Sequence, residues 1–326
     1  MAVHHSVLFT GGLDSTYRLF QLALDDQAVV QPIYLMFPDD GNSRFVRPEL
    51  VREMKAQDSV LNILSSSPFT KASFLPIRRI FRDEIFLNPD SLSLERPLAE
   101  FQLGWQYLYF AALRQWIPHL ELCHEDYMNP SLVDKLFFLK DGYSFKADIQ
   151  RSHPILSFIF EGFDFPIFGT SRTRMISEIS SSVYSDLLFY VFFCYKSVDG
   201  QPCGYCDNCR GKIEQGLASY FPKESIHRYL VYFFLKDIMF SDFLEAFDLY
   251  VHHKQKPTFA IVNNPRLLRL FRRIEEIDKL PSSVLKQKII NGTLEFGCRT
   301  SKRERIINYK KDVSRKHMLD YLGDLK

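Results

Sequence analysis

The sequence of 326 residues has no long apolar run, few cysteines and almost no net charge. Its longest apolar run, 187–194, falls well short of the ~20 residues that a transmembrane helix needs. A formal net charge of +2 is too small to argue for nucleic acid as a partner. The polar N-terminus leads directly into an expected strand, so we expect no signal peptide and a cytoplasmic protein. In that compartment the six cysteines are expected as metal ligands or free thiols before disulfides.

A glycine-containing turn follows the first apolar segment of the chain. Residues 6–9 are predicted to form a buried strand, Gly11 and Gly12 follow at once, and a helical apolar pattern begins after Asp14 and Ser15. Such a turn leaves backbone N–H groups unpaired at a helix N-terminus, where they and the helix dipole attract phosphate. The turn has neither the Lys and spacing of a Walker A motif nor the third Gly of the dinucleotide fingerprint. A simple helix cap by Asp14 or Ser15 is the alternative explanation.

Strands and helices alternate through the first half of the chain. This rhythm predicts an α/β fold with a parallel sheet and helices on both faces. Ligands of such sheets lie beyond the carboxyl ends of the strands, where the glycine turn falls. Residues 127–152 are less regular and are predicted as an insertion or a lid, and Thr170 or Ser171 is expected to cap a later helix. The further strands are expected at 31–37, 72–77 and 120–123, and the helices between them at 47–64 and 101–116.

Four of the six cysteines lie close together in the pattern Cys-x8-Cys-x2-Cys-x2-Cys. Four thiolates satisfy the tetrahedral preference of Zn2+, and closed four-sulfur sites are structural. The alternatives are unrelated buried or free cysteines, and a redox Cys-x-x-Cys, which the fourth cysteine disfavours. Cys123 and Cys298 are expected to be ordinary thiols. The predicted zinc ligands are Cys194, Cys203, Cys206 and Cys209.

Residues 10–15, Thr-Gly-Gly-Leu-Asp-Ser, match the Ser-Gly-Gly-x-Asp-Ser signature of the PP-loop ATP pyrophosphatases, with Thr10 in the first Ser position. Together with the cysteine cluster, this loop resembles the 7-cyano-7-deazaguanine synthase family. In that family Thr-Cys-Tyr precedes a glycine-containing loop and then Cys-Gly-x-Cys-x-x-Cys. Here Phe193-Cys194-Tyr195 leads to residues 203–209 with the same cysteine spacing. The resemblance covers about residues 5–217.

The resemblance implies a reaction of ATP with 7-carboxy-7-deazaguanine. The carboxylate attacks the α-phosphate to give an acyl adenylate and pyrophosphate, and an amine then displaces AMP. In the synthases the amine is ammonia, and a second ATP dehydrates the amide to a nitrile. A carboxylate is a poor electrophile until it carries a good leaving group, so the loop must hold the departing pyrophosphate.

The resemblance also implies the residues of the site. Asp14 is expected to be catalytic as well as part of the loop, and Mg2+ is expected to bridge phosphate oxygens without a dedicated protein cage. The implied ATP-binding residues are Thr10, Gly11, Gly12, Leu13, Asp14, Ser15 and Thr16.

The chain departs from the family pattern at two basic positions. The family has Gly-Arg-Asn before its central helix, whereas this chain has Gly104, Trp105 and Gln106, so Trp105 becomes a candidate to stack on a ring. A family lysine near the start of a later helix corresponds to Arg172, which keeps the charge. Arg172 and Arg174 are therefore candidates to stabilise phosphate charge in the transition state. Cations on a helix surface are an equally supported interpretation of both.

Residues after about 218 lie beyond the usual end of the synthase family. Amphipathic helices are expected at 226–240, 243–251 and 266–280. Residues 299–316 are basic, which is typical of a solvated helix face and less often of a nucleic-acid contact, so a nucleic-acid partner stays open. The expected domains are a PP-loop domain (1–192), a zinc-binding knuckle (193–217) and a helical extension (218–326).

The helical extension favours a docking surface for a protein partner, and a homodimer stays open. Synthase-like proteins of bacterial antiviral defence operons carry the same loop and knuckle on diverged, extended chains, and there the activated carboxylate is thought to pass to an amine on a partner protein. Our leading hypothesis is such a ligase. The alternatives are a free-standing synthase that releases the nitrile, a catalytically silent nucleotide-binding module and a tRNA-modifying PP-loop enzyme. The intact Asp14 and Ser15 disfavour the silent module, and the absence of an obvious tRNA-binding domain disfavours the last.

Overall fold

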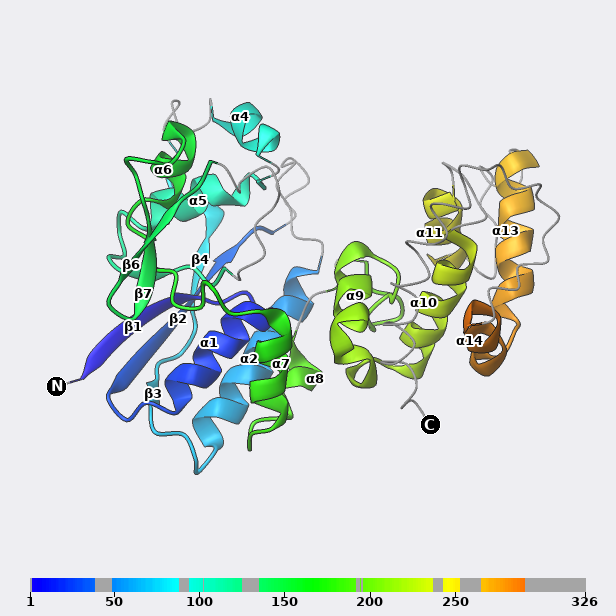
Figure 1. Ribbon diagram of the computed structural model, residues 1–326, viewed down its shortest axis with the longest axis horizontal. Coiled ribbons are helices and arrows are strands. Elements are labelled where there is room, and N and C mark those ends of the chain that lie inside the picture. The colour runs from blue at the N-terminus through cyan, green and yellow to red at the C-terminus, as the bar shows by residue number, and fades with distance from the viewer. Residues whose placement is uncertain are drawn as a thin grey trace. The chain divides into compact units, whose positions relative to one another are not determined.

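The computed structural model of the chain consists of two compact units, residues 1–193 and 194–326 (Figure 1). The finer division of the second unit at 217 stays a prediction. The basic segment 299–316, Cys298 and two residues of the cysteine motif, Phe193 and Tyr195, lie outside the described residues. The described residues are 2–38, 49–87, 94–101, 103–124, 135–191, 194, 196–236, 243–252 and 265–290.

A parallel sheet forms the centre of the first unit and confirms the predicted α/β class. Its strand order is β3-β2-β1-β5, and β4 pairs with β2 beyond the end of β3. Val7 and Leu8 are both buried, as expected of a parallel strand that is covered on both faces. The strands are β1 (Val3–Leu8), β2 (Ala28–Met36), β3 (Ser73–Phe74), β4 (Arg78–Phe81) and β5 (Leu120–Glu121).

Two predictions about these elements are wrong in detail. The strand expected at 72–77 is only the two residues of β3, and β4 begins just after that range; Pro76, which has no N–H for a ladder, lies between them. The irregular insertion expected at 127–152 contains a β-hairpin, β6 (Phe138–Asp141) and β7 (Ser144–Ala147). Gly142, the first of the two turn residues and at a positive φ, is the local signal for that turn.

The hairpin continues the main sheet through isolated bridges. Glu121 of β5 pairs in parallel with Asp164, and Phe165 pairs with Phe145 of β7. The chain at 164–165 therefore acts as one more short parallel segment beside β5. Its carboxyl end lies at the same edge of the sheet as the carboxyl ends of β1 and β5.

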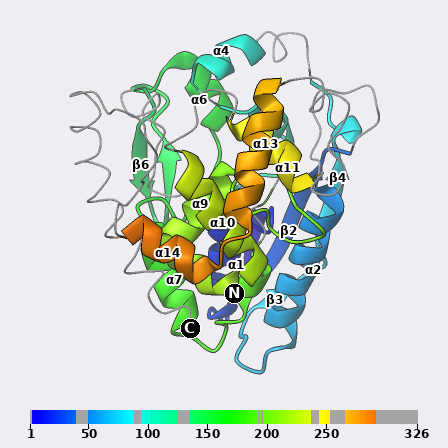
Figure 2. The ribbon, with the colours of Figure 1, turned by 90° about the vertical axis from the view of Figure 1, so that its right-hand side faces the viewer.

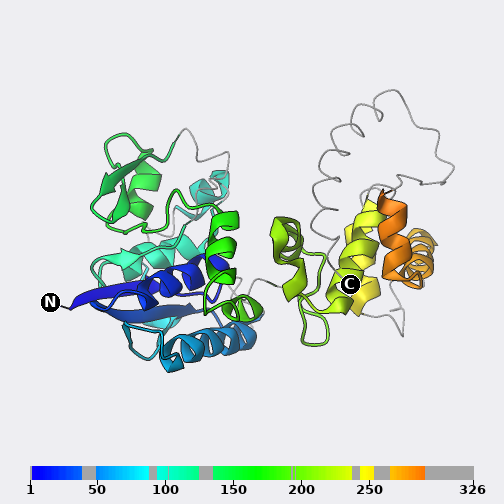
Figure 3. The same cartoon turned by 60° about the horizontal axis from the view of Figure 1, so that its bottom comes forward.

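Helices cover both faces of the sheet (Figures 1 and 3). One face carries helices that pack against α1, and the other carries α5 and its neighbours. The helix expected at 101–116 is shorter, since residues 101 and 103–105 are outside α5. On the first face lie α1 (Leu13–Ala23), α2 (Leu50–Ser66), α7 (Arg172–Ser180) and α8 (Leu187–Tyr190); on the second lie α4 (Glu95–Glu100), α5 (Gln106–Leu113) and α6 (Pro154–Phe160).

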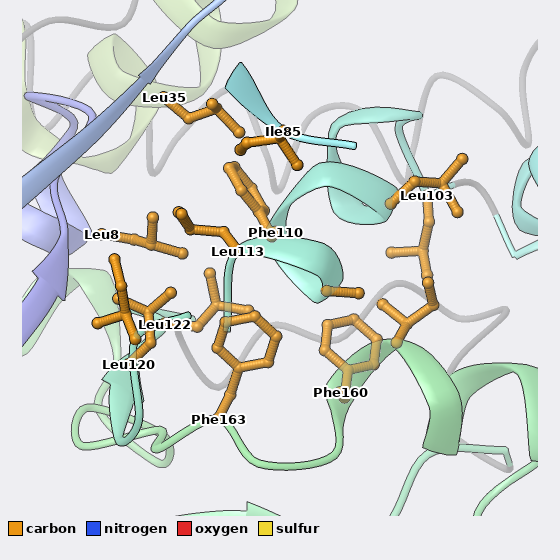
Figure 4. Close-up of a cluster of buried hydrophobic side chains, with 14 of the residues drawn as sticks. Leu8, Leu35, Ile85, Leu103, Phe110, Leu113, Leu120, Leu122, Phe160 and Phe163 are labelled. Atoms are coloured by element: carbon orange, nitrogen blue, oxygen red, sulfur yellow. The ribbon is translucent and has the colours of Figure 1, made fainter. Parts of the chain in front are cut away.

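The core of the first unit lies between the sheet and the face formed by α5 and α6. Leu8 and Leu120 from the strands belong to one buried cluster with Phe110 and Leu113 from α5 and Phe160 from α6 (Figure 4). Each fully buried Leu or Phe side chain contributes about 1.5–3 kcal/mol. This core fixes the position of β1 relative to β5.

The second unit is helical, and its helices at the three expected positions are confirmed within the described residues. Figure 2 shows α13 beside α11, with which it packs. Tyr250 and Phe271 make an edge contact between these helices, with ring centroids 5.0 Å apart. The sequence analysis did not predict α14. The elements are α9 (Asp207–Lys212), η2 (Ile213–Leu217), η3 (Ala218–Tyr220), α10 (Lys223–Lys236), α11 (Phe243–His252), α13 (Pro265–Asp278) and α14 (Ser282–Ile290).

Candidate functional site

The glycine loop lies where the strand order of the sheet reverses. The strands β2, β3 and β4, which follow β1 in the chain, all lie on one side of β1 in the sheet. The next strand, β5, lies on the other side of β1. Ligands of open α/β sheets bind beyond the carboxyl ends of the strands at such a switch point. Residues 9–12 leave the carboxyl end of β1 there and lead into α1.

The loop presents a row of backbone donors. Gly12 N–H donates weakly to Thr10 Oγ1 (3.4 Å), and Thr16 N–H donates to the Gly12 carbonyl (3.0 Å). Successive N–H groups without acceptors at a helix N-terminus form an anion-binding concavity. Among the loop residues, the N–H groups without an acceptor in the described part of the chain are those of Thr10, Gly11, Leu13, Asp14 and Ser15.

Gly11 allows the loop to pass close to α2. Its φ is +74°, and a Cβ at this position would lie 3.2 Å from Gln57 Cγ. The Gln57 side chain is fully buried and its Nε2 donates to the carbonyl of Phe9 (3.2 Å). A side chain at Gly11 would therefore be both strained and crowded.

Neither Asp14 nor Ser15 caps α1, so the simple capping interpretation fails. Gly12 occupies the N-cap position and no side chain accepts a bond there. Ser15 Oγ donates to the Gly12 carbonyl (3.3 Å) and lies 3.5 Å from Thr10 Oγ1. Asp14 Oδ1 is buried, and no donor among the described residues reaches it. The same is true of the hydroxyl of Thr16, a fully buried residue.

The first turn of α7 belongs to the same edge of the sheet, because the parallel segment 164–165 leads into it. Ser171 caps the helix by accepting a bond from the Arg174 N–H (3.3 Å), which confirms one of the two predicted caps. Arg172 is half-buried at the start of this helix. Arg174 is exposed and its Nε donates to Glu178 Oε1 (2.6 Å).

Tyr17 connects α7 to α1. Its hydroxyl donates to Glu178 Oε2 (2.5 Å), and burial together with that bond raises the pKa of Tyr17 to about 12. Arg174 therefore belongs to a three-residue bridge between the two helices.

Trp105 lies in an aromatic cluster beyond the carboxyl end of β2. Its ring meets Phe37 edge to face with centroids 4.5 Å apart, and Tyr109 contacts both rings. The ring is partly buried against the core. Its role in stacking on a ligand stays a prediction.

A buried ion cluster beside the loop was not predicted. Glu121, completely buried at the end of β5, accepts bonds from His5 Nδ1 (2.7 Å) and from Arg18 Nε (2.7 Å) and Nη2 (3.0 Å). Burial alone would raise the pKa of Glu121, but the bonds from His5 and Arg18 hold it below its ordinary value. These three residues are far apart in the sequence, so no spacing pattern could have found them.

The four predicted zinc ligands converge in the second unit. Their Sγ atoms all lie within 4.8 Å of one another, and Cys203 Sγ is 3.7 Å from Cys209 Sγ. Zn–S bonds of about 2.3 Å in a tetrahedron place two sulfurs about 3.8 Å apart. The donor set and its spacing thus fit a metal ion such as zinc.

Backbone amides surround the sulfur atoms. The N–H of Cys203 donates to Cys194 Sγ (3.2 Å), that of Cys206 to Cys203 Sγ (3.2 Å), and that of Cys209 to Cys206 Sγ (3.5 Å). Hydrogen bonds from amide N–H groups to sulfur favour the thiolate, the form that binds metal.

Helix α10 holds the turn between the second and third cysteines. Gly204 has φ +86°, and a Cβ there would lie 2.1 Å from the carbonyl oxygen of Ser225. Arg228 donates from Nε to the Cys203 carbonyl (2.8 Å) and from Nη2 to the Pro202 carbonyl (3.0 Å). The cysteine cluster and the first long helix after it are therefore one packed structure.

Comparison of the chain with protein-family models, with curated proteins and with solved structures finds no match. In the part of the chain that the structure describes, every helix is too short or too polar to cross a bilayer.

Proposed function

We propose that this protein is an ATP-dependent ligase of the PP-loop type, which adenylates a 7-deazaguanine carboxylate and transfers it to an amine. One observation carries the proposal: the row of backbone N–H groups from Thr10 to Ser15 at the switch point beside β5. These donors suit the phosphates of ATP and the pyrophosphate that leaves. The resemblance of this loop and the cysteine cluster to the deazaguanine synthases supplies the substrate class.

The polar side chains of the loop divide into two roles. The N–H groups and the hydroxyls of Thr10 and Ser15 bind phosphate oxygens and orient the α-phosphate towards the carboxylate. Asp14 repels phosphate, but its buried Oδ1, which no donor in the described chain reaches, fits a hard cation. When bound with ATP, Mg2+ neutralises charge on the triphosphate. Arg172, at the same edge of the sheet, is the proposed cation for charge that develops on the phosphate.

The cysteine cluster has a separate, structural role. We propose that Cys194, Cys203, Cys206 and Cys209 hold Zn2+ and that the ion takes no part in the chemistry. A four-sulfur site leaves no open position for substrate. The helices that follow are the proposed docking surface for the protein whose amine accepts the activated carboxylate.

The products of the reaction test this function. The protein is incubated with ATP, Mg2+, ammonium and 7-carboxy-7-deazaguanine, with and without the protein encoded beside it, and the products are analysed by mass spectrometry. AMP without free nitrile, together with a mass increase on the neighbouring protein, is the expected result. Free nitrile would instead identify a free-standing synthase. No AMP in either mixture, compared with a control lacking the carboxylate, would contradict both.

A further inference from the structure

Asp14 and Arg18 are one helical turn apart in α1. Residues at i and i+4 of a helix lie on the same face, with Cβ atoms about 5–6 Å apart, and opposite charges at this spacing attract. An ion pair between the two side chains is therefore the expected local arrangement. The structure shows a different one.

Glu121 engages Arg18 instead. Both carboxylate oxygens of Glu121 accept from the guanidinium, at 2.7 and 3.0 Å, in a bidentate pair. His5 Nδ1 and the Tyr143 hydroxyl (3.4 Å) bind the same carboxylate, and the Tyr143 ring lies 5.6 Å from Arg18 Cζ. Asp14 Oδ1 has no partner in the described part of the chain, although an arginine is four residues away.

The charges explain why Arg18 stays with Glu121. A carboxylate that is completely buried needs a cation, and Arg18 is the cation that makes two bonds to it. The charges of Arg18 and Glu121 cancel, so the charge of Asp14 is left for another cation.

We propose that Glu121 is a positioning residue, which holds Arg18 away from Asp14 and so keeps the Asp14 carboxylate available to the divalent cation that accompanies ATP. The inference rests on the proposed function for the identity of the ligand. The separation of Arg18 from Asp14 by Glu121 is a property of the first unit alone and is testable without ATP.

The test compares the wild type with Glu121→Gln and with the double variant Arg18→Met/Glu121→Gln. In Glu121→Gln the guanidinium loses its charged partner and pairs with Asp14. The affinity for Mg2+-ATP, measured by calorimetry, is expected to fall by about tenfold. A neighbouring guanidinium weakens the binding of a proton by an Asp by about 10- to 1000-fold, and we take the lower end of that range for the cation. The double variant removes the guanidinium, so the affinity returns to within about threefold of the wild type. Tyr143→Phe, which removes one bond from the same carboxylate but leaves Arg18 held, is the matched control and should bind as the wild type does.

If Glu121 only stabilised the fold, removing Arg18 as well would not restore the affinity for Mg2+-ATP. A double variant that binds no more tightly than Glu121→Gln therefore overturns the inference. A crystal structure of Glu121→Gln without nucleotide gives a second readout. The Arg18 guanidinium is expected within hydrogen-bond distance of the Asp14 carboxylate, and a guanidinium that stays beside residue 121 would overturn the inference. If Arg18 moves to Asp14 in a protein that does not bind Mg2+-ATP, the proposed function fails and the positioning stands.

Arg18→Met/Glu121→Met covers the case in which Glu121→Gln does not fold. Apolar replacement of both members of a buried ion pair is often tolerated, and no guanidinium then remains beside Asp14. This variant is expected to bind Mg2+-ATP like the wild type. A folded variant that has lost binding would show that the ion pair itself is required and would overturn the inference.

Discussion

The glycine loop and the cysteine cluster are both built around backbone N–H groups and differ in where these groups point. In the cysteine cluster, the amides of Cys203, Cys206 and Cys209 donate to sulfur atoms of the cluster itself. In the loop, the amides from Thr10 to Ser15 are mostly without acceptors in the described structure. The sulfur atoms of the cluster thus accept bonds from within the cluster, whereas the loop leaves its donors for a ligand. This difference is the one expected if the cluster is a structural metal site and the loop, as we propose, binds and releases phosphate groups.

The largest expected effect is loss of the metal from the cluster. Cys206→Ser should abolish zinc binding, measured as metal content of the purified protein, and should unfold the second unit, because structural zinc contributes about 10–16 kcal/mol in small metal-dependent folds. Helical circular dichroism should fall while nucleotide binding by the first unit persists. Cys123→Ser, a change at a cysteine of the first unit, is the control. Unchanged metal content in Cys206→Ser would remove the four-sulfur assignment.

The loop should respond in the opposite way, with function lost and stability kept. Asp14→Asn removes the charge of a half-buried carboxylate whose buried Oδ1 has no donor in the described structure, so the first unit should be at least as stable as before. AMP formation should fall by about 100-fold or more, the scale of losing one preorganised electrostatic group. Asp25→Asn, a change just after α1, is the control for both measurements. Preserved turnover in Asp14→Asn would exclude this carboxylate from the mechanism.

Substitutions of two glycines in the second unit distinguish a crowded position from an open one. Gly204→Ala places a Cβ 2.1 Å from the Ser225 carbonyl at a positive φ, so it should lower the stability of the second unit by more than about 2 kcal/mol. Gly211 lies in α9, and a Cβ there meets nothing within 4 Å. Gly211→Ala should raise helix stability by about 0.5–1 kcal/mol. Urea unfolding measures both. Equal effects of the two substitutions would show that α10 does not hold the cysteine turn.

Local patterns predicted much of this structure, and non-local contacts were missed. The spacing of the four cysteines predicts their convergence because a metal knuckle is made by neighbours in sequence. The strand, glycine turn and helix at the N-terminus were likewise predicted from one continuous segment. No local sequence pattern predicts the ion cluster of Glu121, Arg18 and His5, because these residues meet only when β5 pairs with β1. The break at Pro76 and the hairpin turn at Gly142 had local signals that the sequence analysis did not use.

The smallest expected effect on activity concerns the two arginines of α7, which the sequence alone could not distinguish. Arg174 is held by Glu178, which Tyr17 also binds, whereas Arg172 starts the helix at the carboxyl edge of the sheet. Arg172→Gln should therefore lower the kcat of AMP formation by about tenfold, since a cation near the developing phosphate charge is lost. Arg174→Gln should change kcat less, because its main contact is to Glu178 on its own helix. Glu178→Gln provides the matched control for loss of that bridge. A larger effect of Arg174→Gln than of Arg172→Gln would mean that Arg174 leaves Glu178 when ATP binds, and would assign the phosphate contact to Arg174 instead.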